Sequence, residues 1–397
     1  MPERVAKKYW DGTHRVVSPR ETLARIQPFF SKMGITRLAN VTGLDTIGIP
    51  VVMCCRPNSR ALAVSQGKGW DLDAAKASAA MEAIEAWHAE HVTLPLKLAT
   101  YEELRAAHRV VDISLLPRTA ASRVHPNLPL LWVEGDDWLQ GEKVWVPFQL
   151  VHGAYTTAMR FDLSGFDASS TGLAGGNHPL EAGSHAVCEV VERDALYKFS
   201  LLSESERNAR RIDLDTVSHP QCREHLDRCS RAGVAVAAWD VTSDVGLAAV
   251  YCLIAERDDE PFRRLYAAAG VGCHPASHIA FQRALTEAAQ SRLTVISGAR
   301  DDNLRRAYLG WRDPSSLERL RRLASMAGSR PFSAIPSFEA AAFEEDLERE
   351  LELVRRAGFD RVVALDLTMP EFAIPVLRVI IPGMRRLGDQ DPLEGCS

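Results

Sequence analysis

The sequence predicts a mixed α+β fold, because short apolar runs separated by turn residues alternate with longer helical segments that carry little charge. Three of those helical segments carry glutamates three or four residues apart, so each set of carboxylates lies along one helical face. The chain has 397 residues, of which 46% are hydrophobic and 25% charged, as is ordinary for a globular protein. The sequence contains no repeat at a fixed period and no clear linker. We therefore expect residues 1–397 to form one composite domain.

The N-terminal part is expected to form a short helix followed by an antiparallel meander. Residues 1–30 are polar and mixed, and they lead into a helix predicted from Glu21 to Lys32. Turn residues separate three apolar runs that read as strands, at Arg37–Val41, Ile49–Cys55 and Ala61–Ser65. A glycine-bearing loop, Gln66–Gly69, leads out of the third strand. Asp71 or Asp73 can then cap a helix of about 20 residues that ends at His91.

The rest of the chain continues the mixture of strands and helices. Two strands are expected near Leu128–Glu134 and Lys143–Leu150, and a stretch rich in glycine and serine, 169–177, opens a helix that runs through Tyr197. A hairpin follows at Val234–Thr242 with Leu247–Ala255. Two helices come next, at Pro275–Leu293 and Phe338–Arg356, and two apolar runs finish the fold, at Val362–Leu367 and Ile374–Ile381.

Composition excludes several classes of function. The net charge of −5 gives no electrostatic case for nucleic-acid binding. No apolar run approaches the roughly 20 residues that span a bilayer, and the N-terminus has no apolar core of a secretory signal. The eight cysteines form no Cys-x-x-Cys pair, and Cys54 and Cys55 are adjacent, so we expect reduced thiols in a cytoplasmic enzyme.

The carboxylate-bearing helices are the candidate functional feature. Their polar residues fall on single faces among Ala, Val, Leu and Ile: Ser78, Glu82 and Glu85; Glu181, Glu189 and Glu192; Arg283, Glu287 and Gln290. Six inward-facing glutamates would repel one another and would be costly to bury. Bound cations, arginine partners or protonation would resolve this. If the faces converge, Mg²⁺ carrying a polyphosphate is the economical answer, because hard oxygen ligands suit hard cations.

Each motif also has a simpler structural interpretation. Gly67-Lys68-Gly69 lacks the spacing of a Walker A loop and could be a surface turn with a solvated lysine. The second helix could form a buried salt-bridged face with Arg193 and Arg283 as partners, and Asn177 could be only its N-cap. Neither a Ser-His-Asp pattern nor zinc-ligand spacing stands out.

Taken together and in order, these motifs resemble the YcaO family. The resemblance spans residues 12–384, leaving a C-terminal tail at 385–397. It is carried by Gly34–Arg37, Ser65–Gly69, Ser78-x-x-x-Glu82-x-x-Glu85, Gly176-Asn177-x-x-x-Glu181, Glu189-x-x-Glu192-Arg193, Glu287-x-x-Gln290 and the segment Ile374–Gly383.

The resemblance implies an ATP- and Mg²⁺-binding cleft lined by helices and by mixed or antiparallel sheets, unlike the P-loop and Rossmann folds. It implies metal ligands at Glu82, Glu85, Glu181, Glu189, Glu192 and Glu287. It implies contacts to nucleotide or phosphate from Lys68, Ser78, Glu82, Asn177, Glu181, Arg193 and Arg283, and also from Arg15 and Thr22 in the N-terminal segment. Glu287, Gln290 and Arg283 are the residues it implies for catalysis.

Members of the family activate a backbone amide of a ribosomally made peptide by phosphorylating its oxygen, so the resemblance implies a peptide substrate. The chain has Ala86 where the family often has arginine, and it ends without the Pro-x-Pro-x-Pro tail of many azoline-forming members. We therefore expect the thioamide-forming branch, with a TfuA-type partner protein. An azoline-forming cyclodehydratase and a nucleotide-binding accessory protein are the alternatives, and a homodimer is expected.

Overall fold

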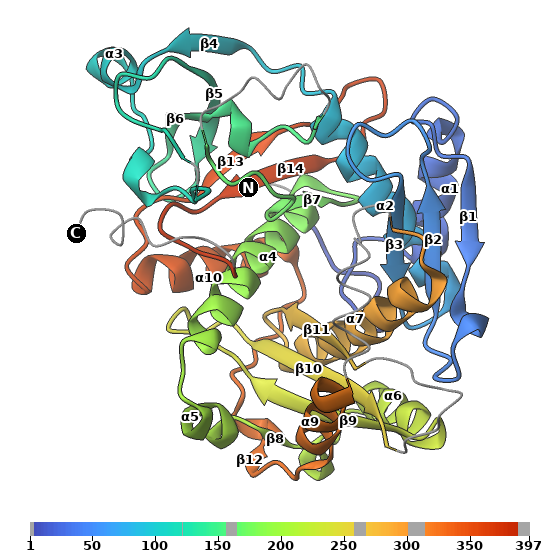
Figure 1. Cartoon of the computed structure of the whole chain (residues 1–397). Coiled ribbons are helices and arrows are strands. Elements are labelled where there is room, and N and C mark those ends of the chain that lie inside the picture. Colours follow the sequence, from blue (N-terminus) through green and yellow to red (C-terminus); the bar gives the residue numbers. More distant parts are fainter. Residues whose placement is uncertain (1–3, 121, 156–164, 258–266, 301–313, 388–397) are drawn as a thin grey trace.

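The computed structural model describes residues 4–120, 122–155, 165–257, 267–300 and 314–387. Three larger sheets lie around three long helices, and each packs mainly against one of them (Figure 1). The long helices are α2 (Leu72–Glu90), α4 (Pro179–Ser200) and α7 (Ser277–Ser297). This mixed α/β arrangement confirms the predicted fold class.

The first sheet is the predicted N-terminal meander. Its strands are antiparallel, in the order β1 (Arg37–Asn40), β2 (Val51–Cys55) and β3 (Val64–Lys68). The third strand begins three residues later than predicted, so the expected loop at Gln66–Gly69 is wrong: Gln66, Gly67 and Lys68 belong to the strand. Helix α2 packs directly on this strand because glycine lets the two backbones approach, and a Cβ on Gly67 would lie 2.0 Å from the backbone nitrogen of Ala79.

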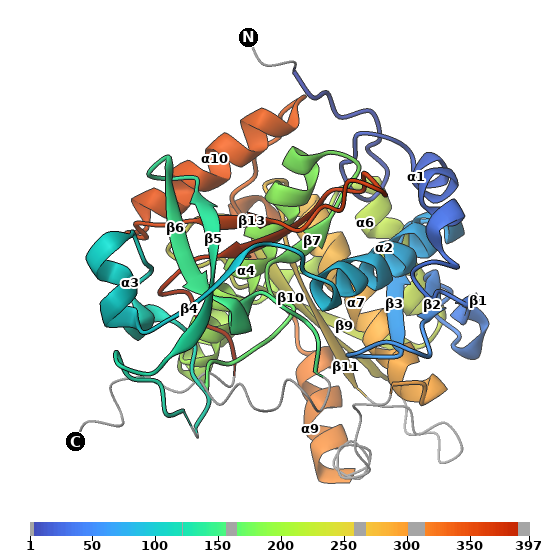
Figure 2. The same cartoon turned by 90° about the horizontal axis from the view of Figure 1, so that it is seen from above.

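The N-terminal segment passes the start of α10 (Phe343–Arg356) and then leads to α1 (Pro19–Ile26), which packs on α2 (Figure 2). The helix predicted at Glu21–Lys32 ends at Ile26 and continues as a 3₁₀ turn, because Pro28 has no amide hydrogen to donate. Helix α10 begins at Phe343 instead of the predicted Phe338, because Ala342 pairs with Ala6 of the N-terminal segment as an isolated bridge.

The second sheet contains the predicted central hairpin. The antiparallel strands are β9 (Val234–Asp240), β10 (Ala249–Glu256) and β11 (Ala268–Cys273), and α7 lies on β11. Glycine again permits close packing, because a Cβ on Gly270 would lie 2.3 Å from the carbonyl oxygen of Ala284. The hairpin and the helix were predicted, whereas β11 was not.

The third sheet joins the middle of the chain to its C-terminal part. Its order is β4-β5-β13-β14-β7, with β6 paired to β5, and α4 packs on β14 and β7. The strands are β4 (Leu96–Ala99), β5 (Leu130–Asp137), β6 (Glu142–Pro147), β7 (Leu173–Gly175), β13 (Val363–Asp366) and β14 (Val376–Ile380). The strands predicted near β5 and β6 are confirmed, and the two final apolar runs form β13 and β14. The pairing of these strands was not predicted, nor were β4 and β7.

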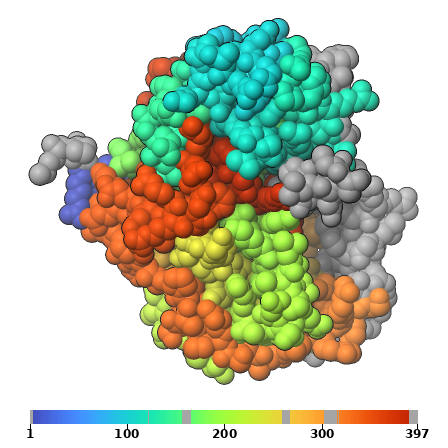
Figure 3. All heavy atoms as spheres, turned by 90° about the vertical axis from the view of Figure 1, so that its left-hand side faces the viewer, coloured from blue at the N-terminus to red at the C-terminus, as the bar shows by residue number. Residues whose placement is uncertain are grey.

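Shorter elements surround the three sheets and their long helices. On the face shown in Figure 3, orange-red residues from the C-terminal part lie between the teal upper part and the yellow-green lower part. The remaining elements are α3 (Tyr101–Ala107), α5 (Glu204–Ala209), α6 (Pro220–Arg231), α9 (Pro314–Ser325), and the parallel pair β8 (Ile212–Asp213) and β12 (Arg330–Pro331).

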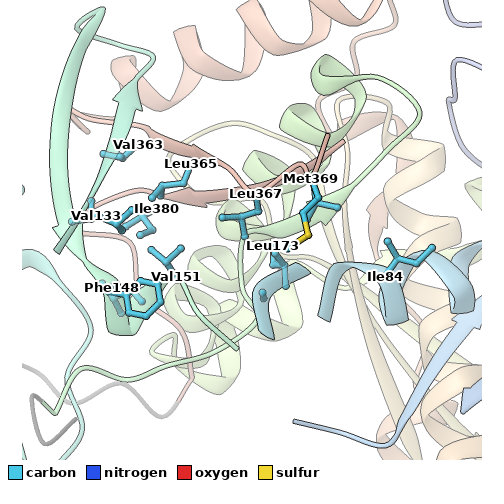
Figure 4. Close-up of a cluster of buried hydrophobic side chains, with 14 of the residues drawn as sticks. Ile84, Val133, Phe148, Val151, Leu173, Val363, Leu365, Leu367, Met369 and Ile380 are labelled. Carbon is cyan, nitrogen blue, oxygen red and sulfur yellow. The ribbon is translucent and has the colours of Figure 1, made fainter. Parts of the chain in front are cut away.

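A large buried cluster joins helix α2 and the first sheet to the third sheet. Figure 4 shows side chains from α2, β5, β7, β13 and β14 packed together. Its labelled members are Ile84, Val133, Phe148, Val151, Leu173, Val363, Leu365, Leu367, Met369 and Ile380. Burying such side chains stabilises the fold by roughly 1.5–3 kcal/mol each. The cluster thereby fixes α2 against the sheet on which α4 packs.

Among the described residues, no helix is both long and apolar enough to cross a bilayer. The predicted C-terminal tail lies outside the described residues from residue 388 onward.

A buried ion pair between Arg56 and the last residue of α2, Glu90, provides a test of how α2 packs. Arg56 donates to the Glu90 carboxylate at 2.6 Å, and both side chains are almost completely buried. Replacing Arg56 with Met should destabilise the protein by roughly 3–5 kcal/mol, because a buried carboxylate loses its partner. Urea unfolding measures this. Arg105→Met, which breaks an exposed pair with Glu102, should cost under about 0.5 kcal/mol. Equal effects of the two substitutions would contradict the burial argument.

Candidate functional site

The three long helices line one cavity of about 1110 Å³. Helix α2 lines it with Ser78, Glu82 and Glu85, helix α4 with three glutamates and Arg193, and helix α7 with Arg283, Glu287 and Gln290. All of the site residues predicted from the sequence line this cavity: Arg15, Thr22, Lys68, Ser78, Glu82, Glu85, Asn177, Glu181, Glu189, Glu192, Arg193, Arg283, Glu287 and Gln290. The three faces therefore converge on one cavity, which the spacing alone had left open.

Strand β3 and helix α7 meet at a charged contact. Lys68 Nζ lies 2.7 Å from Glu287 Oε2, and the backbone N–H of Val271 donates to the other oxygen of Glu287. Lys68 is neither a solvated surface lysine nor part of a glycine loop. It is a cation fixed in the cavity wall, and Gly67 beside it serves helix packing.

On α4, Arg193 accompanies two glutamates. Its guanidinium lies 3.4 Å from Glu192 Oε1 and 3.9 Å from Glu189 Oε1. The carboxylates, chiefly Glu192, raise the pKa of Arg193 above its ordinary value. Arg193 therefore stays charged and offsets part of the negative charge of this wall.

The start of α4 and the N-terminal segment form another part of the cavity wall. The N–H of Val16 and the amide of Asn177 donate to Glu181, and Thr22 Oγ1 donates to Asn177 Oδ1 at 3.1 Å. Arg15 Nε lies 3.7 Å from Glu181 Oε1. The network brings two residues of the N-terminal segment to a glutamate more than 150 positions away.

Asn177 is not the N-cap of α4, contrary to the structural interpretation of the sequence. His178 takes that position and accepts a hydrogen bond from the N–H of Leu180. The Asn177 side chain is consequently free to bridge Thr22 and Glu181.

Backbone amides around β7 orient two further carboxylates. Gly175 N–H donates to Glu85 at 2.7 Å, and Gly172 N–H donates to Glu189 at 3.2 Å. A Cβ on Gly175 would lie 2.6 Å from the end of the Met81 side chain and 3.1 Å from the Glu85 carboxylate, so glycine gives both side chains room. Each carboxylate keeps a second oxygen for another ligand.

Burial keeps several of these carboxyls from ionising at their ordinary pH. It raises the pKa of Glu82 and that of Glu192 to about 7, against the opposing attraction of Lys68 and Arg193 respectively. It also raises the pKa of Glu189, and that of Glu85 well above its ordinary value. Glu287 differs, because Lys68 and Arg193 outweigh burial and lower its pKa. Protonation and basic partners thus both reduce the repulsion among these carboxyl groups, as expected for crowded acids.

Arg283 and Ser78 complete the predicted set. Arg283 donates to the carbonyl oxygen of Cys273 at 2.9 Å, so its fork is anchored at the end of β11 while the side chain lines the cavity. Ser78 lines the cavity one turn before Glu82. Both are in place to donate to an anion.

Among the cavity residues that were not predicted as site residues are His185, Arg378 and Gln66. His185 lies between Glu181 and Glu189 on α4, and burial, followed by nearby Arg283, lowers its pKa well below the ordinary value. Arg378 on β14 is buried, and burial lowers its pKa to about 10. The helical spacing that exposed the glutamates also marks His185, whereas Arg378 and Gln66 sit on strands where the sequence gives no comparable signal.

The raised acid pKa values make a pH-dependent prediction. Between its ordinary pKa of 4.5 and about 7, Glu82 is protonated in the folded protein and ionised in the unfolded chain, so the folded state holds more protons. Its contribution to stability therefore falls as pH rises through this window. Glu82→Gln should match the wild type near pH 4.5 and exceed it by on the order of 1–2 kcal/mol at pH 8. Denaturant unfolding at both pH values measures the difference, and a pH-independent difference would contradict it.

Comparisons with known proteins are consistent with this geometry. The family model described as YcaO cyclodehydratase, ATP- and Mg²⁺-binding, matches residues 66–385. A protein of Rhizobium leguminosarum bv. trifolii, described as an uncharacterized protein in the tfuA 3' region, is 37% identical over 379 residues, covering 94% of this chain and 89% of that protein.

Two solved structures share the fold. A heterocyclase in complex with substrate and cofactor has a TM-score of 0.79 at 19% identity, covering 97% of this chain and 54% of that one. The structure of YcaO from Methanopyrus kandleri bound with AMPPCP and Mg²⁺ has a TM-score of 0.75 at 24% identity, covering 96% and 94%. These likenesses extend over nearly the whole of this chain.

Proposed function

The chain belongs to the YcaO family, whose members bind ATP and Mg²⁺, and from this premise we propose that it uses ATP to activate a backbone amide of a ribosomally made peptide. The observation that carries the proposal is the convergence of six glutamates from three helices on one cavity. If the glutamates were only structural, the protein would bear the cost of burying several acids that must be protonated or repel one another.

The donor set fits Mg²⁺. The carboxylates are oxygen ligands, and Glu85 and Glu189 are each held on one oxygen by a backbone N–H. Burial raises the pKa of four of the acids, so a divalent cation would replace protons there. We assign Glu82, Glu85, Glu181, Glu189, Glu192 and Glu287 as the residues that would hold it. Bound Mg²⁺ would neutralise phosphate charge and orient the phosphates for transfer.

The basic and polar residues of the cavity would hold the nucleotide. Arg15, Thr22 and Asn177 form one connected group at the N-terminal end, and Lys68, Arg193 and Arg283 supply positive charge beside the glutamates. Phosphoryl transfer depends mainly on positioning and charge neutralisation, so fixed cations suit it.

The chemistry explains why an amide needs this site. A nucleophile adds its electron pair to the amide carbon, and the carbonyl pair moves to oxygen. That oxygen takes the γ-phosphoryl group of ATP, and ADP leaves. The C–O bond then breaks with its pair going to phosphate, while the nucleophile or the amide nitrogen loses a proton. Arg283 and Gln290 lie where they can orient the reacting groups.

We propose thioamide formation with a TfuA-type partner as the specific reaction. The support is the 37% identical relative described by its position in a tfuA 3' region. In this reaction external sulfide is the nucleophile and oxygen is replaced by sulfur. Azoline formation is the second candidate, because the family model carries the name cyclodehydratase. There the nucleophile is a Cys, Ser or Thr side chain, and water is lost.

Two experiments test the proposal in sequence. Calorimetric titration with a non-hydrolysable ATP analogue should show binding that requires Mg²⁺. Incubation with ATP, a candidate peptide and the partner should then raise the peptide mass by the exchange of oxygen for sulfur, whereas azoline formation would lower it by one water. ATP hydrolysis that never depends on a peptide would instead favour an accessory protein.

A further inference from the structure

Strand β3 and helix α7 meet at two neighbouring contacts, one charged and one neutral. The charged contact is the Lys68–Glu287 pair. In the neutral contact, the side chain of Gln290 donates to the backbone oxygen of Gln66 at 3.2 Å. Gln66 and Lys68 lie two residues apart on one strand and therefore share a face, and Glu287 and Gln290 lie one turn apart on one helix face. The neutral contact therefore lies about 6–7 Å along the strand from the charged one.

The neutral contact leaves two polar atoms without a partner. Gln66 is 3% exposed, and the Thr294 hydroxyl donates to its Oε1, which leaves Nε2 as an unused donor. Gln290 uses Nε2 in the contact to β3 and leaves Oε1 as an unused acceptor. Both residues line the cavity. Among the residues that the structure describes, neither atom has a hydrogen-bond partner, which is costly unless a ligand supplies one.

We propose that Gln66 and Gln290 form a binding subsite for one secondary amide of the peptide backbone. Gln66 Nε2 donates to the amide carbonyl oxygen, and Gln290 Oε1 accepts the amide N–H. The inference rests on the proposed function, because it places the peptide of that reaction. One donor and one acceptor match the two hydrogen-bonding groups of a backbone amide.

Charge and position favour an amide over a phosphate here. The neighbouring cavity residues on α7, Ser291, Thr294 and Val295, are uncharged. The nearest charged groups are the adjacent Lys68–Glu287 pair and Glu82, whose carboxylate hydrogen-bonds to the backbone of Gln66. A peptide held by the two glutamines would thus lie next to phosphates held by the charged contact. A donor at the carbonyl oxygen would also favour the negative charge that develops there when the nucleophile adds.

The test uses a molecule with a single secondary amide and its ester. N-methylacetamide and methyl acetate are titrated by ligand-observed NMR, with and without Mg²⁺ and a non-hydrolysable ATP analogue. The wild type should bind the amide about tenfold more tightly than the ester, which has no N–H to donate. Gln66→Met should weaken amide binding by about fivefold to tenfold and leave nucleotide affinity unchanged. Gln290→Met should abolish the preference for amide over ester.

Controls separate the local effect from damage to the fold. Gln282→Met removes another buried cavity glutamine, whose Nε2 donates to Gln221, and it should leave amide binding unchanged. Thermal melting checks each variant, and Gln66→Glu provides a second substitution that turns the donor into an acceptor. That variant should also weaken amide binding.

Two kinds of result would overturn the inference, and a third would contradict only the proposed function. A wild type that binds neither probe, or variants that change no affinity, would mean that the two atoms hold only water. A loss of selectivity between ATP and GTP analogues in Gln66→Met, with amide binding intact, would mean that the pair contacts the nucleotide base. Amide binding by a wild type that binds no Mg²⁺–nucleotide would support the subsite and contradict the proposed function instead.

Discussion

Glu192→Gln is expected to weaken binding of a Mg²⁺–nucleotide by roughly a hundredfold or more, which corresponds to about 3 kcal/mol. Glu192 lies on the cavity face of α4 beside Arg193, and a neutral amide there removes both a hard oxygen ligand and part of the charge that attracts the cation. Calorimetric titration with a non-hydrolysable ATP analogue and Mg²⁺ measures the loss. Glu189→Gln should behave in the same way.

The unliganded variant should be as stable as the wild type or more stable. Burial raises the pKa of Glu192 to about 7, so the ionised carboxylate destabilises the folded protein above that pH. Glu350→Gln is a matched control: Glu350 is fully buried, burial raises its pKa well above the ordinary value, and it does not line the cavity. It should leave nucleotide binding unchanged. A Glu192→Gln protein that fails to fold while nucleotide affinity persists would show that the carboxylate is structural.

Gly67→Ala is expected to have the largest effect on folding. Its Cβ would lie 2.0 Å from the nitrogen of Ala79 and 2.4 Å from the carbonyl oxygen of Ala75, both rigid backbone atoms of α2. The helix and strand would have to separate, which we expect to cost roughly 3 kcal/mol or more. Because α2 carries Glu82 and Glu85, any folded fraction should also bind Mg²⁺–nucleotide more weakly.

Gly43→Ala is the matched control for this substitution. No heavy atom lies within 4 Å of the position of its Cβ, and its backbone is not left-handed. Denaturant unfolding of the two variants should therefore differ by several kilocalories per mole. Similar stabilities would mean that α2 and β3 adjust without strain.

The site was predicted better than the strands that support it. Helical spacing alone placed Glu82, Glu189 and Glu287 on inward faces, because a period of 3.6 residues fixes which side chains share a face. Spacing could not show that the three faces meet, since that depends on three separate sheets. The family resemblance supplied this expectation, and the structure confirms the convergence.

The missed features depend on contacts distant in sequence. Gly67 was predicted to lie in a loop, whereas it belongs to strand β3. The glycine is explained by α2, whose backbone approaches too closely for a side chain at this position. Strand β7 is only three residues long and is defined by pairing with β14, some 200 positions later. The sequence assigned no individual role to Gln66 or Arg378. Both lie on strands, and only the folded structure shows which residues face them across the cavity.

The arrangement of one glutamate-bearing helix per sheet has a consequence for cooperativity. The centre of the empty protein is repulsive, and a polyvalent ligand would contact α2, α4 and α7 at once. Binding free energy would then be shared by all three helices. Amide hydrogen exchange in the three helices should therefore slow together when Mg²⁺–nucleotide is added.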